Sequence, residues 1–382
     1  MRLPCVRAHT SEGLTGARAA VGWERSQSVA RTASGDPDGS EEVLADVART
    51  LDDLAAISGV SRSTVSRVIN GGPSSERARS RVMAALEETG YRPNLAARTL
   101  ASGRSGVVGV VIHLAPGLLF QDPYFGRLLQ GVADALAERS LGMMLWLGNR
   151  SREENLERIL SMRLLDGAIV TAHEVDDPLV DGLLASSLPI VLLGHRRDDV
   201  TASYVSIDDV AALDAVVRHL ASIGRTRIGH ISGKRGTVAA EDRIAGFWRA
   251  IDRAGLRDAA RVVDGDFTEP AGERGAAELI DAGVDAIACG NDAAAQGALK
   301  VIHERGLRVP EDIALTGFDD LEFAAQMDPP LTTVRQGIQT QGVYAGRALF
   351  DLLSHPDDGP RRIVLPTELV IRQSTVGGSS RS

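Results

Sequence analysis

Residues 50–105 read TLDDLAAISGVSRSTVSRVINGGPSSERARSRVMAALEETGYRPNLAARTLASGRS, and their spacing predicts two short helices joined by a tight turn and followed by a third helix. Thr50 can cap a helix that begins at Leu51, and the acids in its first turn complement the helix dipole. Gly59 supplies the turn. The apolar side chains of this first helix are expected on one face: Leu54, Ala55 and Ile57. This order of elements is typical of a helix-turn-helix unit.

The second helix is predicted over residues 61–70, with Ser61 as its cap. Three apolar side chains are expected to face inward: Val65, Val68 and Ile69. The polar side chains then project outward: Arg62, Ser63, Ser66 and Arg67. The DNA major groove is about 12 Å wide and admits one α-helix, and arginine can donate two hydrogen bonds to guanine. We therefore expect this helix to read DNA.

A third helix is predicted to begin near Ser75 and to end at Gly90. Pro93 then disfavours helix at the residue before it, and Asn94 can cap a short segment at residues 95–100. One or two turns are too few for a stable isolated helix. This segment is therefore expected to become helical only when DNA or a partner subunit supports it.

The whole stretch resembles the DNA-binding region of the LacI/GalR family of bacterial transcriptional repressors, through residues 60–61, 64–71, 90–94 and 96–100. The resemblance implies that three side chains read base edges: Arg62, Ser63 and Arg67. It implies backbone phosphate contacts by Thr50, Ser61, Thr64, Ser66, Asn70 and Asn94. It also implies that Leu100 wedges between base pairs in the minor groove, beside the small Ala97. The alternative is a helical bundle with basic, solvated faces.

The charge of the chain is unevenly distributed. The whole chain has a net charge of −9. Residues 61–105 hold eight arginines and three acidic residues, a net charge of +5, so the rest of the chain carries −14. This asymmetry favours a basic DNA reader attached to an acidic body. The two cysteines, Cys5 and Cys289, lack the spacing of a disulfide scaffold or a metal site. We expect no metal and no cofactor.

The ends of the chain predict little structure. Residues 1–48 are rich in Arg, Ser, Gly and Ala and are expected to form a disordered leader, and residues 376–382 a disordered tail. The leader has no apolar signal core, and no apolar run reaches membrane-spanning length. We therefore expect a cytoplasmic protein that makes no membrane contact. The tail lacks apolar heptads, which leaves dimer and tetramer both open.

From residue 106 onward, short apolar runs alternate with longer amphipathic stretches. Strands are predicted at residues 107–112, 143–147, 168–170, 190–193, 228–231, 286–289 and 313–316. Helices are predicted at residues 208–224, 239–256, 272–282 and 292–306. Repeated strand–helix units predict parallel, doubly wound sheets, and their number favours two α/β lobes.

This second stretch resembles the effector-binding core of the same family, a periplasmic-binding-protein-like pair of lobes. The implied fold is an all-α helix-turn-helix domain at residues 49–92, a hinge helix and linker at 93–105, and an α/β core at 106–375. The resemblance divides the core into an N-terminal lobe, residues 106–206 and 336–363, and a C-terminal lobe, residues 207–335 and 364–375. It also implies that the core forms a dimer.

Ligands of doubly wound sheets bind beyond the carboxyl ends of the strands. The resemblance implies effector contacts for eight residues near such ends: Tyr124, Phe125, Thr171, Thr237, Arg243, Asn291, Asp319 and Gln336. An arginine, a carboxylate and two amides suit a hydroxylated ligand such as a sugar, because each hydroxyl both donates and accepts a hydrogen bond. An aromatic ring can cover one face of such a ligand.

Each polar candidate has a structural alternative. Asn291 or Asp292 can simply cap the helix that follows. Arg243 could form a surface ion pair with Glu241 or Asp242 instead of binding a ligand. The motif around Arg243 favours the ligand contact.

The remaining candidates also leave alternatives. Asp319 could hold a turn, and either Tyr124 or Phe125 could pack in the core while the other faces the cleft. His195 stands near the place where the family has a polar residue and could replace it, or it could be an exposed turn residue. Two further histidines are expected to be structural: His173 and His230.

These features predict a homodimeric transcription factor that binds a roughly palindromic DNA operator and responds to a small-molecule effector, a sugar or related metabolite. One rival is a solute-binding protein with the same two-lobed core. Another is a sugar-processing enzyme, which the sequence does not favour because it shows no Ser-His-Asp set, metal cluster or phosphate-binding glycine loop. The sign and identity of the effector stay open.

Overall fold

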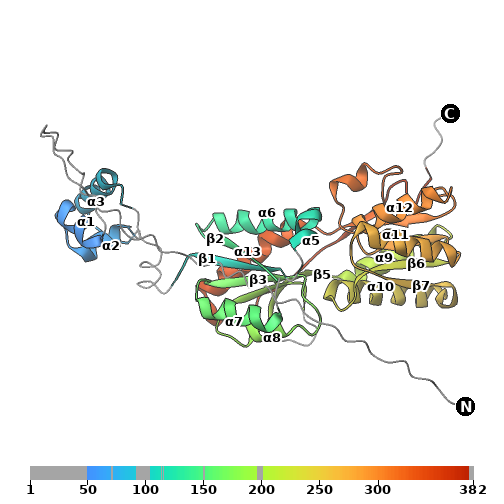
Figure 1. Ribbon diagram of the computed structural model, residues 1–382, viewed down its shortest axis with the longest axis horizontal. Coiled ribbons are helices and arrows are strands. Elements are labelled where there is room, and N and C mark those ends of the chain that lie inside the picture. Colours follow the sequence, from blue (N-terminus) through green and yellow to red (C-terminus); the bar gives the residue numbers. More distant parts are fainter. Residues whose placement is uncertain are drawn as a thin grey trace, which may run out of the picture. The chain divides into compact units, whose positions relative to one another are not determined.

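The computed structural model describes residues 50–69, 72–91, 104–112, 114, 116–148, 151–195 and 201–377 (Figure 1). The chain divides into two compact units, Met1–Arg92 and Pro93–Ser382. The predicted leader, the hinge segment at residues 95–100 and the last five residues of the tail lie outside the described residues. The first unit is called the head below and the second the core.

The head contains three helices: α1 (Leu51–Ser58), α2 (Arg62–Ile69) and α3 (Glu76–Thr89). Thr50 caps α1 in a complete capping box, because its hydroxyl accepts from Asp53 N and the Asp53 carboxylate accepts from Thr50 N. Gly59 ends α1 with φ of 63°, a left-handed conformation that favours glycine. Gly90 ends α3 in the same way. The predicted starts and ends of α1 and α3 are therefore confirmed.

The core of the head is small and comes from all three helices. Its fully buried apolar side chains are Leu54, Val65 and Val82, with Val68 and Ala85 beside them. One expectation about α1 is wrong: Ile57 is 45% exposed, and Ser58 is buried instead. Ser58 lies four residues after Leu54 on the same helical face, where its hydroxyl donates to the Leu54 carbonyl.

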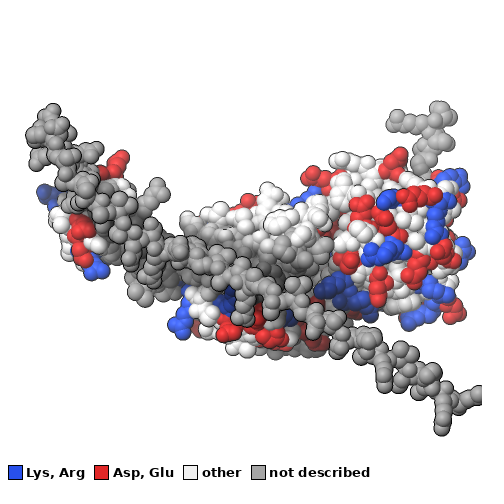
Figure 2. Space-filling model, in the orientation of Figure 1, with Lys and Arg blue, Asp and Glu red and all other residues white. Residues whose placement is uncertain are grey.

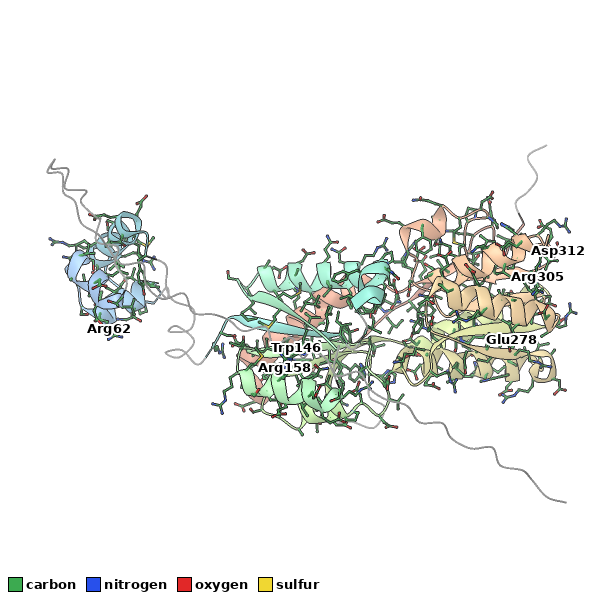
Figure 3. All side chains as sticks on the ribbon, viewed as in Figure 1. Arg62, Trp146, Arg158, Glu278, Arg305 and Asp312 are labelled. Carbon is green, nitrogen blue, oxygen red and sulfur yellow. The ribbon has the colours of Figure 1, made fainter. Side chains whose placement is uncertain are left out.

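The N-terminal lobe of the core is built on a six-stranded sheet in the order β11-β5-β4-β3-β1-β2, in which every neighbouring pair is parallel. Its strands are β1 (Val107–Ile112), β2 (Gly142–Leu147), β3 (Gly167–Thr171), β4 (Ile190–Leu193), β5 (Ser203–Ile207) and β11 (Arg362–Leu365). On one face pack α6 (Pro123–Ala137) and α13 (Ile338–Ser354), and on the other α7 (Arg152–Met162) and α8 (Pro178–Leu184). The short α5 (Pro116–Gln121) precedes α6. On the α7 side, the Arg158 guanidinium lies 5.8 Å from the Trp146 ring centre (Figure 3).

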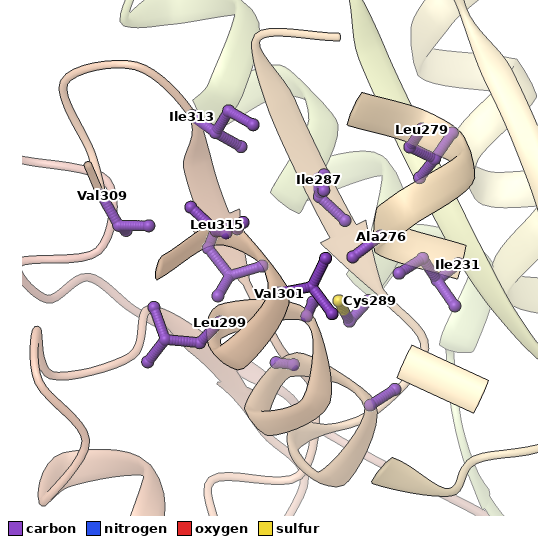
Figure 4. Close-up of a cluster of buried hydrophobic side chains, with 14 of the residues drawn as sticks. Ile231, Ala276, Leu279, Ile287, Cys289, Leu299, Val301, Val309, Ile313 and Leu315 are labelled. Carbon is purple, nitrogen blue, oxygen red and sulfur yellow. The ribbon is translucent and has the colours of Figure 1, made fainter. Parts of the chain in front are cut away.

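The C-terminal lobe repeats this architecture around a four-stranded parallel sheet in the order β7-β6-β8-β9. Its strands are β6 (Ile228–Lys234), β7 (Arg261–Gly265), β8 (Ala286–Cys289) and β9 (Ala314–Thr316). One face is covered by α9 (Asp209–Ser222) and α10 (Val238–Ala254), and the other by α11 (Glu269–Asp281) and α12 (Asp292–Glu304). Figure 4 shows the second of these cores, where Ile287 and Cys289 of β8 belong to the same apolar cluster as Leu279 of α11 and Val301 of α12.

The outer surface of the C-terminal lobe mixes acidic and basic side chains (Figure 2). An ion pair of this kind joins Lys300 of α12 to Glu273 of α11 at 2.7 Å. The polypeptide passes between the lobes three times: after β5, between β10 (Thr333–Arg335) and α13, and between β11 and β12 (Glu368–Val370). Strands β10 and β12 pair antiparallel, so two of these crossings are tied together.

Candidate functional site

The first candidate site is the exposed face of α2. Arg62, Ser63 and Arg67 are all exposed on it, whereas Val65 and Val68 of the same helix are buried. Ser61 caps the helix, because its hydroxyl accepts from Thr64 N at 3.2 Å. The predicted faces of α2 are therefore confirmed for these five side chains, whereas Ser66, predicted to face outward, and Ile69, predicted to face inward, are both half-buried. The second helix of the head presents a row of arginine and hydroxyl side chains of the kind that suits a DNA groove.

The arginines of this face make only weak contacts within the head. The Arg62 guanidinium lies 3.4 Å from the Asp52 carboxylate, and both side chains are 66% exposed. Arg67 donates to the Ser63 carbonyl at 3.3 Å. Exposed ion pairs contribute little stability, so both guanidinium groups can exchange these partners for bases or phosphates. The other predicted DNA contacts at Asn70, Asn94, Ala97 and Leu100 lie outside the described residues.

The second candidate site is a cleft of about 550 Å³ whose walls come from both lobes of the core. It opens at the carboxyl ends of the strands of both sheets, the usual ligand position in this kind of fold. All eight residues predicted to contact an effector line it: Tyr124, Phe125, Thr171, Thr237, Arg243, Asn291, Asp319 and Gln336. Segments that are separated by up to about two hundred residues in the sequence therefore meet in one place.

Arg243 occupies the floor of the cleft and is 5% exposed. Its Nε donates to the Asp209 carboxylate at 2.8 Å and its NH1 donates to the Gly290 carbonyl at 2.6 Å. Its guanidinium also lies 3.7 Å from the Phe318 ring centre, an interaction that favours the cation. Arg243 therefore forms a buried ion pair rather than the surface pair with Glu241 or Asp242 considered above.

Asp319 is the carboxylate of the cleft and is also 5% exposed. It accepts a hydrogen bond from Gln336 Nε2, and the Gln336 amide oxygen in turn accepts from Gln341 Nε2 at 2.9 Å. Burial raises the pKa of the Asp319 carboxyl well above its usual range, and the nearby Arg243 opposes that shift. Asp319 has φ of 117°, which an L residue rarely adopts, so the surrounding structure must hold it in place.

Both polar atoms of the Asn291 side-chain amide form hydrogen bonds within the protein. Its Oδ1 accepts from Ala294 N at 2.9 Å and so caps α12, while its Nδ2 donates to the Phe267 carbonyl at 2.8 Å. The structural alternative considered for Asn291, capping of the following helix, is therefore the role of its Oδ1 in this structure. A ligand would have to share or replace one of these bonds.

The two aromatic candidates differ in position. Phe125 is 8% exposed and packs in the core of the N-terminal lobe, whereas Tyr124 is only partly buried. Burial raises the pKa of the Tyr124 phenol, and the carboxylate of Asp319 adds to this shift. Both rings line the cleft in an edge-to-face pair with centres 5.1 Å apart. Tyr124 is therefore the ring better placed to meet a ligand.

Contacts between the lobes close one edge of the cleft. Val175 N donates to the Gly236 carbonyl at 2.8 Å, and Lys234 Nζ donates to the Glu174 carboxylate at 2.9 Å. His195 Nε2 lies 3.5 Å from the Asp242 carboxylate. His195 is thus a partly buried residue between the lobes rather than a fully exposed turn residue.

Of the two histidines expected to be structural, His173 lines the cleft. His230 does not line it: the ring is fully buried against Phe247, and burial lowers its pKa to about 4. Within the described ranges, no three His, Cys, Asp or Glu side chains gather in a way that could hold a metal ion. No helix there combines the length and apolar character needed to cross a bilayer.

Comparison with known proteins connects the two sites. The model for bacterial regulatory proteins of the lacI family matches residues 50–94, and that for a periplasmic binding protein-like domain matches residues 217–375. The HTH-type transcriptional regulator CelR of Thermobifida fusca is 36% identical over 334 residues, which cover 85% of this chain and 98% of that protein. The chain belongs to the LacI/GalR family.

Two solved structures of the LacI/GalR family share the fold. A CelR–cellobiose complex has 33% sequence identity and a TM-score of 0.66, and the match covers 86% of this chain and 100% of that one. A lac repressor dimer bound to operator and an anti-inducer has 27% identity and a TM-score of 0.76, with 85% and 98% covered. The predicted fold class is therefore confirmed. As a LacI/GalR family member the chain is a transcriptional regulator and not an enzyme.

The sequence interpretation missed two groups that this LacI/GalR cleft contains. Asp209 is the buried partner of Arg243 but lies 34 residues before it. Phe267 lines the cleft with φ of 69°, its ring so close to Gly233 that a Cβ there would clash with it, and its carbonyl accepts from Asn291 Nδ2. The available signal for Phe267 was its place directly after the β7 strand, which was itself not predicted.

Proposed function

We propose that this chain is a homodimeric, cytoplasmic transcriptional regulator that binds a roughly palindromic DNA operator and changes its affinity when a sugar occupies the cleft. The observation that carries the proposal is the presence, on one chain, of an exposed arginine-bearing helix α2 and a cleft between two lobes that holds buried polar groups among apolar walls. The sugar-bound structure of CelR and the operator-bound dimer of the lac repressor support it.

The proposal assigns base reading to Arg62, Ser63 and Arg67, because they are exposed on the helix that follows the tight turn. The backbone role falls to neighbouring hydroxyl groups: Thr50, Ser61, Thr64 and Ser66. A single head offers few phosphate contacts, whereas two heads related by symmetry would place two α2 helices in successive major grooves. Dimerisation is therefore part of the proposed mechanism.

The cleft supports sugar binding because its buried polar groups are arginine, carboxylate and amide groups arranged around partly apolar walls. Each of these groups can exchange hydrogen bonds with a hydroxyl, which both donates and accepts. An effector that binds one relative position of the lobes more tightly than another shifts the equilibrium between them. Such a shift would change the spacing of the two heads and so the affinity for the operator.

The test is selection of operator fragments from genomic DNA by the purified protein, followed by fluorescence anisotropy on the selected site at several salt concentrations. We expect two protein chains per site and a steep fall of affinity with salt, with a slope of roughly −0.9 for each phosphate contacted. Failure to select any fragment would contradict DNA reading. A binding protein that served only transport would give that result.

A further inference from the structure

The ionisable groups of the cleft are mostly acidic. In the part of the cleft formed by described residues, five lining residues carry carboxyl groups: Asp122, Asp209, Asp266, Glu269 and Asp319. Among the described lining residues, two carry a permanent cation: Lys234 and Arg243. Phosphate-binding sites normally offer uncommitted arginine or lysine side chains or free backbone N–H groups. The start of α10 at Thr237 lines the cleft without a side-chain cap, but the described charged side chains around it are mainly acidic rather than basic.

Both cations already have partners. Arg243 is held by the Asp209 carboxylate and the Gly290 carbonyl at the floor of the cleft. Lys234 is held at the mouth by the Glu174 carboxylate, which also lies 2.9 Å from Arg152 NH2. A phosphate group at either cation would have to displace or face a carboxylate, and like charges across an interface strongly disfavour binding.

The cleft also penalises negative charge by burial. Desolvation raises the pKa of three lining carboxyls above the usual range for aspartic acid: Asp122, Asp209 and Asp319. A phosphate entering the same space would lose hydration in the same way. Uncharged hydroxyl groups lose less on entry and can use the carboxylates as hydrogen-bond acceptors.

The polar groups of the cleft form two sets along α12. The deep set contains Asn291, which caps the helix and is 2% exposed. The second set lies at the mouth, where exposed Gln296 donates to the Glu269 carboxylate at 3.5 Å. Gln296 lies five positions after Asn291, so the backbone rises about 7.5 Å along the helix axis between them. That separation is longer than one sugar ring, and the volume of about 550 Å³ suits a ligand of more than one ring.

We infer that the effector is an uncharged oligosaccharide of at least two rings, with one ring in the deep set and the next against Glu269 and Gln296. This inference rests on the proposed function and narrows its ligand class. It excludes phosphorylated sugars and single hexoses as the cognate effector. It also assigns Gln296 as a specificity-determining residue for the second ring.

The first experiment is calorimetric titration of the full-length protein with neutral disaccharides, namely cellobiose, maltose, lactose and mannobiose, with their monosaccharides, and with the 6-phosphates of cellobiose and glucose. At least one disaccharide should bind roughly tenfold more tightly than its monosaccharides, the effect of one added hydrogen bond. Both phosphorylated sugars should bind at least about 100-fold more weakly than that disaccharide. A monosaccharide or a phosphorylated sugar that binds as tightly, or no binding by any disaccharide, overturns the inference.

The second experiment uses matched variants with the disaccharide that binds. Gln296→Ala should abolish its advantage over the monosaccharide, whereas Lys300→Ala, one turn further along α12 and outside the cleft, should not. If both variants lose the affinity advantage of the disaccharide equally, Gln296 does not determine the specificity for the second ring. The operator selection described above measures recovery of DNA, with and without sugar, whereas these titrations measure sugar binding without DNA, so loss of DNA binding and an error in the ligand class give different results.

The third experiment tests the charge argument. Glu269→Gln should reduce the ratio of the affinity for the neutral disaccharide to the affinity for its 6-phosphate by roughly tenfold. Glu278→Gln removes the same charge from the same helix, but Glu278 lies toward the end of the lobe remote from the N-terminal lobe (Figure 3), so it should leave the preference unchanged. An unchanged preference in Glu269→Gln, or an equal change in both variants, overturns the charge argument.

Discussion

The side chains of the α2 face are exposed and weakly paired, whereas those of the cleft are buried and hydrogen-bonded to one another. Arg62 contacts an exposed carboxylate, and Arg67 contacts a backbone carbonyl and the Thr64 hydroxyl at 3.5 Å. Arg243 has its Nε and NH1 bonded and is almost inaccessible to solvent. A substitution at the α2 face should therefore change binding without changing stability. A substitution in the cleft should change both.

The largest expected effect follows from removing the Arg243 side chain. Arg243→Met should leave the Asp209 carboxylate buried without its cation, at a cost of about 3–5 kcal/mol in the free energy of unfolding of the core. The response to the effector should be lost as well. Urea denaturation of the core and sugar titration measure the two losses.

Two further variants make this prediction specific. Asp209→Asn combined with Arg243→Met removes both charges and should recover part of the stability. Arg249→Met removes an arginine of the same helix, but its pair with Asp214 is partly exposed and Asp214 keeps Arg218 and Arg253. That variant should cost less than about 1 kcal/mol. A similar cost for the variants at Arg243 and Arg249 would contradict the distinction between buried and exposed pairs.

The α2 face gives the next largest effect. Arg67→Ala should weaken operator binding by about 1–3 kcal/mol. The free energy of unfolding should change by less than about 0.5 kcal/mol, because the side chain is exposed. Arg67→Lys keeps the charge without the planar fork, so it should lose affinity for the operator more than for random DNA. Anisotropy with both DNAs measures this, and equal affinity of wild type and Arg67→Ala would remove Arg67 from the reading face.

The buried acids near the cleft predict an effect of pH on the stability of the core. Burial raises the pKa of the Asp292 carboxyl to about 7. Hydrogen bonds that its oxygens accept from the Thr333 hydroxyl and from Leu321 N oppose this rise. The unfolded carboxyl ionises at lower pH, so the stability from this group is complete below about pH 4 and is lost as the pH rises through 7. The slope is at most about 1.4 kcal/mol per pH unit.

Asp292→Asn should remove that contribution. Urea denaturation of wild type and variant between pH 4 and 8 gives the difference in their free energies of unfolding. The contributions of the other buried acids are the same in both proteins and cancel in this difference. The stability of the wild type relative to the variant should fall with rising pH. Parallel curves for the two proteins would show that Asp292 is ionised when folded.

The same contrast explains what could be predicted from the sequence. The head depends on local signals, so Thr50 and Gly59 were enough to place the ends of α1, and Ser75 and Gly90 those of α3. Its one misassigned residue, Ile57, lies on a helix of two turns, where a few apolar positions do not define the buried face. The α2 face needed no knowledge of other segments, because its side chains face solvent.

The core was predicted less completely because its elements depend on distant neighbours. Helices α6 and α13 were not predicted, and both carry interior glycines, which lower helix propensity. A Cβ at Gly131 would lie 2.0 Å from the Gln339 carbonyl oxygen, so this glycine permits the two helices to pack closely. Strand β11 was missed because it is a half-exposed edge strand. The eight cleft residues were found by resemblance, but partners such as Gln341 were not.

The smallest expected effect lies at the start of α1, where the capping box could serve stability, DNA contact or both. Thr50→Ala should destabilise the head by about 1 kcal/mol, because Asp53 N loses the hydroxyl that it donates to at 3.2 Å. Thr50→Ser keeps the hydroxyl and should keep the stability. Hydrogen exchange of the α1 amides measures both.

Asp53→Ala separates the two roles of Thr50. It breaks the other half of the box, in which Thr50 N donates to Asp53 at 2.9 Å, but leaves the Thr50 hydroxyl in place. The α1 amides should then exchange faster, while operator affinity should hold or rise, since a carboxylate near phosphate is removed. If Asp53→Ala lowers operator affinity as much as Thr50→Ala does, the Thr50 hydroxyl affects DNA binding only by stabilising α1. Binding and stability would then change together at this position of the head, as they do in the cleft.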